Sequence, residues 1–121
     1  MTRGEQLRAY ATALASFRHD PLGFVMWAFP WGVAGTALEG EDGPDQWQKS
    51  EQQAIGLHLE TVTEDGSMSP FRGATASGHG IGKSAQTSFL IMWAGMTCVD
   101  ARGVVTANSD TQLRTKTWAE V

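Results

Sequence analysis

The chain has 121 residues, of which 41% are hydrophobic and 18% charged, a composition typical of one globular domain and not of a disordered chain or a coiled coil. Its single cysteine excludes an internal disulfide and a four-cysteine zinc site, and it favours a reducing compartment. The net charge of −4 is opposite in sign to that of a dedicated nucleic-acid-binding domain, and the longest apolar run, residues 89–94, is too short to cross a bilayer.

Two helices are predicted at the start of the chain. Residues 4–17 place apolar side chains three and four positions apart, which indicates an amphipathic helix; these side chains are Leu7, Tyr10, Ala11, Leu14 and Phe17. Asp20 followed by Pro21 predicts the start of a short aromatic helix that runs to about Phe29, because the carboxylate can cap the helix and proline suits its first position. Residues 30–43 are rich in glycine and form a predicted loop of the length often used for binding.

A third helix is predicted after Pro44 and Asp45, by the same proline signal. Its predicted buried face consists of Trp47, Ala54, Ile55, Leu59 and Val62, and its predicted exposed face of Lys49, Glu51 and Gln52. The turn-forming residues 64–67 end it.

The second half of the chain predicts an α/β arrangement. Residues 71–77 and 104–107 are predicted strands, a largely apolar and therefore buried helix is predicted from Lys83 to about Thr97, and Ser109 with Gln112 predicts the capping box of a last helix. The order strand, loop, helix, strand, helix favours a parallel sheet with flanking helices.

The segment between the first predicted strand and its helix is close to the phosphate-loop pattern G-x-x-x-x-G-K-[ST]. It consists of Ser77, Gly78, His79, Gly80, Ile81, Gly82, Lys83 and Ser84, with Ser77 at the position of the first glycine. Its backbone amides would surround the phosphates of ATP, Lys83 would act as the catalytic residue by stabilising charge on the β and γ phosphates, and Ser84 would ligate Mg²⁺. The alternative is a flexible surface turn. A dinucleotide fingerprint does not fit, because Lys83 occupies its third glycine position.

Gln48 is a further candidate, because a glutamine amide can pair with the amino group and ring nitrogen of adenine. The alternative is an exposed helix residue beside a core tryptophan, Trp47. The three histidines, His19, His58 and His79, lack metal-ligand spacing, and Cys98 is interpreted as a small apolar core residue.

Four stretches resemble the N-terminal part of the large terminase subunit of tailed phages and prophages, the ATPase that drives DNA packaging. They are residues 20–25 with Trp27 and Phe29, residues 44–48, residues 76–84, and residues 106–113 with Lys116, Thr117 and Trp118. The resemblance covers about residues 17–121. It implies an incomplete P-loop ATPase domain over residues 44–121, preceded by a helical segment and loop over residues 1–43.

The resemblance also implies partners and a compartment. The partners are the remainder of the large subunit and, in the full assembly, the small terminase subunit, the portal and double-stranded DNA; the compartment is the cytoplasm of a bacterial host, without membrane attachment. Gln48 stands where an adenine-reading glutamine would. Neither the acidic pair that holds Mg²⁺ and activates water nor a nuclease carboxylate cluster can be placed, so we expect a fragment or truncated gene product without turnover of its own.

Two other interpretations remain open at this stage. A small phosphotransferase would need an acceptor pocket and lid arginines after the phosphate loop, where only Arg102 and Arg114 occur. A non-catalytic prophage remnant would instead bind a partner protein through exposed Trp27, Phe29 and Trp31.

Overall fold

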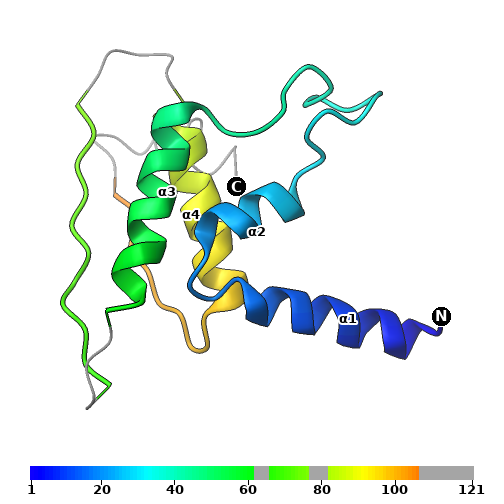
Figure 1. Ribbon diagram of the computed structural model, residues 1–121, viewed down its shortest axis with the longest axis horizontal. Helices are drawn as coiled ribbons and strands as arrows, with labels where there is room; N and C mark the ends of the chain where they lie inside the picture. Colours follow the sequence, from blue (N-terminus) through cyan, green and yellow to red (C-terminus); the bar gives the residue numbers. More distant parts are fainter. Residues whose placement is uncertain (62–65, 77–81, 107–121) are drawn as a thin grey trace. The chain divides into compact units, whose positions relative to one another are not determined.

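The computed structural model describes residues 1–61, 66–76 and 82–106, and contains four helices within them (Figure 1). These are α1 (Arg3–Ser16), α2 (Pro21–Ala28), α3 (Gln46–Leu59) and α4 (Lys83–Thr97). The chain divides into two compact units, an N-terminal unit of Met1–Gly73 and a C-terminal unit of Ala74–Val121. The boundary between residues 43 and 44 stays a prediction.

The predicted α/β fold with a parallel sheet is wrong, because the described residues contain helices and no strand. Residues 71–76 and 104–106, which belong to the two predicted strands, form no β-ladder. The first of them contacts α3 at its start: the His58 and Phe71 rings meet edge to face, and just before the segment the Nε2 of His58 lies 2.6 Å from the carbonyl oxygen of Ser69. The second leaves Val104 89% exposed. Residues 77 and 107, and the last helix predicted from Ser109, lie outside the described residues.

The core of the N-terminal unit is built where α2 packs beside α3 (Figure 1). The Asp20 carboxylate caps α2 as predicted, accepting a hydrogen bond of 2.9 Å from the backbone N–H of Gly23, and Pro21 occupies the first helical position. Phe24 and Val25 are then completely buried. On α3, Gly56 comes close to the start of α2: a Cβ placed there would lie 3.1 Å from the carbonyl oxygen of His19.

The buried face of α3 differs from the predicted one. Gln52, expected on the exposed side, is completely buried, and it shares its face with Gln48 and Ile55 at spacings of four and three residues. Ala54, expected inside, is exposed. The prediction followed apolar residues only, whereas this face is held by two glutamines and a single isoleucine.

The first helix forms with nearly the predicted bounds but buries none of its residues. A capping box fixes its start, in which the Thr2 hydroxyl accepts from the Glu5 N–H and the Glu5 carboxylate accepts from the Thr2 N–H. Leu7 and Tyr10, expected to face a core, are each 59% exposed. Amphipathic spacing predicted the helix correctly and its burial wrongly.

Replacing the most buried aromatic side chain tests the proposed core. We expect Phe24→Ala to lower the free energy of unfolding by about 3–5 kcal/mol, because a completely buried ring is lost and a cavity remains. The measurement is urea unfolding followed by circular dichroism. Met26→Ala, on the same helix but 42% exposed, is the matched control, for which we expect a loss below about 1 kcal/mol. Equal losses in the two variants would contradict this placement of the core.

Candidate phosphate-binding site

The amino end of α4 begins at a glycine in a conformation that other residues rarely adopt. Gly82 is the N-cap, with φ 85° and ψ 29° in the left-handed region, where a side chain costs about 1–2 kcal/mol. Its carbonyl accepts the first hydrogen bond of the helix, 2.9 Å from the N–H of Gln86. Lys83 and Ser84 are consequently the first two helical residues. The rest of the predicted loop, residues 77–81, lies outside the described residues.

The electrostatics of this helix end favour an anion. The first turn of α4 holds no acidic residue, and a glycine N-cap provides no side chain to occupy the first backbone amides. The amino end of α4 is the positive end of its helix dipole, and Lys83 adds a positive charge beside it. Lys83 and Ser84 are partly exposed, so both are accessible from solvent.

The hydroxyl groups further along α4 serve the helix itself. Thr87 donates to the carbonyl of Lys83 and Ser88 to that of Ser84, each at 3.0 Å, and Thr97 repeats the pattern with Trp93 at 2.6 Å. Such bonds to the preceding turn let polar side chains sit on a helix that is partly buried. The expected burial of the apolar segment is found at Trp93, while residues 89–92 are half-buried.

A cavity of about 540 Å³ lies within the C-terminal unit, beginning one turn beyond Lys83. Its lining is mainly apolar and comes from one side of α4 and from residues 101–106; Thr87, Ile91, Gly95, Arg102 and Val104 are among the lining residues. Arg102, one of the two arginines that a phosphotransferase could use, is at this cavity.

Gln48 has a structural task in the N-terminal unit. It is only 5% exposed, and its Oε1 accepts a hydrogen bond of 2.8 Å from the backbone N–H of Asp45, the N-cap of α3. This is one half of a capping box, for which the signal in the sequence is the acidic N-cap followed three residues later by glutamine. In the sequence alone this signal was missed, and Gln48 was interpreted as a residue that recognises adenine. Adenine recognition stays a prediction.

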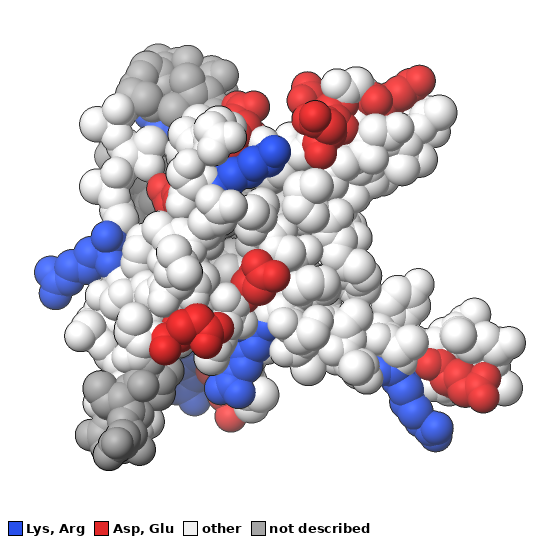
Figure 2. Space-filling model, viewed as in Figure 1, with Lys and Arg blue, Asp and Glu red and all other residues white. Residues whose placement is uncertain are grey.

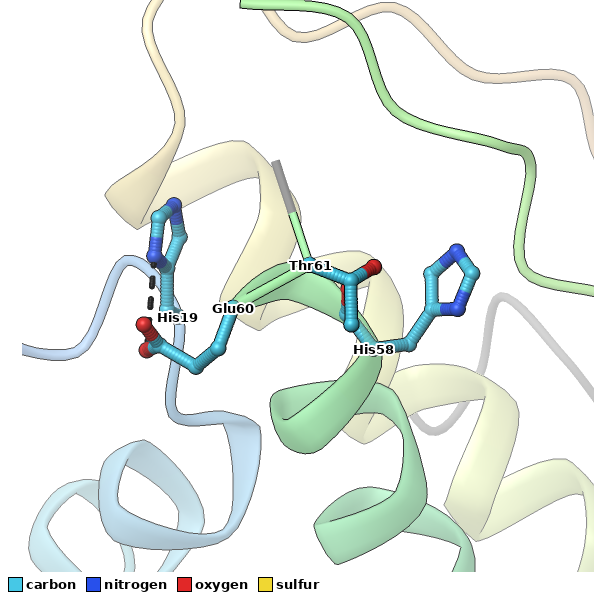
Figure 3. A network of polar contacts seen from close by, with 4 residues as sticks. All are labelled: His19, His58, Glu60 and Thr61. Atoms are coloured by element: carbon cyan, nitrogen blue, oxygen red, sulfur yellow. Dashed lines mark hydrogen bonds and ion pairs between the residues drawn. The ribbon is translucent and has the colours of Figure 1, made fainter. Parts of the chain in front are cut away.

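Histidines lie on both sides of the carboxyl end of α3 (Figure 3). The Nδ1 of His19 lies 3.5 Å from the Oε1 of Glu60, at a cavity of about 500 Å³ that Asp20 and Gln52 also line. His58 lies on the other side, next to Thr61, whose hydroxyl donates to the His58 carbonyl. Within the described ranges, no three His, Cys, Asp or Glu side chains are grouped to hold a metal ion.

Comparison with known proteins identifies no relative: no family model matches the chain, and neither a curated protein nor a solved structure matches it significantly. Among the described residues, no helix combines the length and the apolar character needed to cross a bilayer.

The structural role of Gln48 can be tested without nucleotide. We expect Gln48→Met, which keeps the volume and removes the amide, to lower the free energy of unfolding by about 1 kcal/mol through loss of the cap. Gln53→Met, at an exposed position of the same helix, should leave it unchanged within about 0.5 kcal/mol. Thermal unfolding of the ligand-free proteins provides the comparison, and an unchanged Gln48→Met variant would show that the cap is dispensable.

Proposed function

We propose that the chain binds ATP with Mg²⁺ at the amino end of α4, as the nucleotide-binding portion of a terminase large subunit that powers DNA packaging. The observation that supports this most directly is the left-handed Gly82 immediately before Lys83 and Ser84 in the first turn of α4. A phosphate approaching there meets backbone amides, the positive end of the helix dipole and an ammonium group together. The proposal rests on this local geometry and does not require a parallel sheet.

Each residue has a distinct role in the proposed complex. The lysine would neutralise charge on the β and γ phosphates, and its flexible stem lets the ammonium follow them as a point charge. Ser84 would provide a hydroxyl oxygen, the ligand type that Mg²⁺ prefers. Residues 77–81 would complete the contacts with the phosphates. Hydrolysis needs, in addition, a carboxylate that positions magnesium and water, so binding is the activity proposed for this chain.

The proposed setting follows from the same assignment. In a packaging motor the chain would work in the cytoplasm of a bacterial host, with the remainder of the large subunit, the small terminase subunit, the portal and double-stranded DNA. Residues 74–121 contain four Lys or Arg and three Asp or Glu, whereas residues 1–73 contain five and ten. The segment that holds Lys83 therefore carries none of the negative excess of the chain, which suits a polyanionic ligand.

Loss of the lysine tests the proposed site. We expect ATP with Mg²⁺ at one hundred times its Kd to stabilise the protein by about 2.7 kcal/mol, and Lys83→Ala to weaken binding at least about tenfold by removing a charged hydrogen-bond donor. The measurement is thermal unfolding over a nucleotide titration. Lys49→Ala, which removes a lysine from α3, should keep the full stabilisation.

The outcomes separate the proposal from its alternatives. Equal stabilisation in Lys83→Ala and in the unaltered protein would contradict phosphate binding at α4. A well-folded protein with no response to nucleotide would favour the non-catalytic interpretation, for which the structure offers Trp27, 42% exposed, while Phe29 and Trp31 are half-buried.

The metal role of Ser84 is tested by comparing nucleotide with and without magnesium. In the unaltered protein we expect ATP with Mg²⁺ to raise the Tm more than ATP with a chelator does, because the hydroxyl contributes a ligand to the bound ion. Ser84→Ala should make the two shifts equal while retaining the shift caused by ATP alone. A variant that keeps the full magnesium increment would show that Ser84 does not contact the metal.

A further inference from the structure

An exposed strip of apolar side chains runs from α1 onto α2. Leu7 and Tyr10, three residues apart and so on one side of α1, are each 59% exposed. The Tyr10 ring meets Trp27 of α2 edge to face, with 6.2 Å between ring centroids, and Trp27 is itself 42% exposed. We call Leu7, Tyr10 and Trp27 the α1 strip. A helix of 14 residues is marginal in water by itself, so a surface that covered the strip would stabilise α1.

The charges beside the strip are mainly positive. Arg3 lies one turn before Leu7 and Arg8 directly after it, and both are exposed. Neither forms an ion pair with another described residue. Glu5, the one acidic residue of α1, is occupied in the capping box with Thr2. A partner that fits the strip should therefore be acidic and partly apolar.

The loop after α2 in the same unit has these properties. Residues 33–42, which we call the acidic loop, contain Glu39, Glu41 and Asp42, all exposed, and no Lys or Arg. Val33 adds an apolar side chain that is 50% exposed. Backbone hydrogen bonds fix its shape: the carbonyl of Leu38 accepts from the N–H of Gly32 at 2.8 Å and from that of Glu41 at 3.0 Å. The loop is thus a preformed surface.

Within one copy of the N-terminal unit the two surfaces belong to separate projections. The acidic loop and α1 form two arms on the same side of Figure 1, and in Figure 2 open space separates the acidic arm from the arm of α1. No hydrogen bond or ion pair among the described residues links them.

We propose that the α1 strip of one copy docks on the acidic loop of a second copy, with Arg3 and Arg8 facing Glu41 and Asp42. The charges of the two surfaces are complementary, and each surface offers exposed apolar side chains that the other can cover. Because the surfaces differ, the contact is heterologous, and repeated copies form a ring or an open chain. The association should weaken with salt, since its charges are exposed.

Paired charge reversals test this assembly. Arg3→Glu with Arg8→Glu makes α1 acidic, and Glu41→Lys with Asp42→Lys makes the loop basic. The first pair preserves α1, because Arg3→Glu places an acidic residue in the first turn, where it suits the helix dipole, and Arg8→Glu exchanges one good helix former for another at an exposed position. The second pair leaves the backbone bonds of the loop in place. Sedimentation equilibrium at low salt should show association of the unaltered protein and a mass of 13.0 kDa for each variant alone.

Mixing the two variants is the decisive step. Like charges oppose self-association of either variant, whereas both contacts between unlike variants pair opposite charges, so the mixture should associate as the unaltered protein does. Reversal of Arg72 and Arg102 to Glu, both exposed outside the two surfaces, changes the net charge by the same amount as reversal of Arg3 and Arg8 and should leave association intact. Monomeric unaltered protein, variants that still self-associate, or a mixture of folded variants that stays monomeric would each overturn the proposal.

Discussion

The N-terminal unit depends on the close approach of α3 to the start of α2 at Gly56. A Cβ at this position would lie 3.1 Å from the His19 carbonyl oxygen and 3.7 Å from Cδ of Pro21, so any larger residue would push the two segments apart. An α2 of eight residues is too short to be stable alone. Packing beside α3 therefore makes possible the burial of Phe24 and Val25, and it brings His19 within reach of Glu60.

Features encoded over a few residues could be predicted, and features that depend on distant partners could not. The bounds of α4, the cap at Asp20 and the start of α3 after Pro44 and Asp45 all follow from local signals, and the structure confirms them. Burial of Gln52 could not be predicted, because burying a polar amide is costly and the spacing of apolar residues along one helix places it on the exposed side. The same reason explains why the helix α1 was predicted correctly and the burial of its apolar side chains was not.

The incorrect strands illustrate the same limit for sheets. An extended segment becomes a strand only when another segment pairs with its backbone. Around Ser69 and Phe71 the contacts come from His58 of α3 instead, and at Val104 the side chain remains exposed. The candidate phosphate site is affected less, because a glycine N-cap followed by Lys83 and Ser84 is defined by consecutive residues. Recognition of the base and positioning of a catalytic carboxylate require groups that are distant in sequence, so the spacing of residues could not predict them.

The distribution of charge determines how such a local site could act in an acidic protein. The chain has a net charge of −4, which would repel a triphosphate at long range. At physiological ionic strength the Debye length is about 8 Å, so charges in exposed loops are largely screened at a ligand beyond that distance. In the proposed complex a phosphate would contact Lys83 and the first amides of α4 directly, so these charges would be screened much less. Affinity would then be governed by the few residues at this helix end, and the acidic loop could serve protein association without abolishing nucleotide binding.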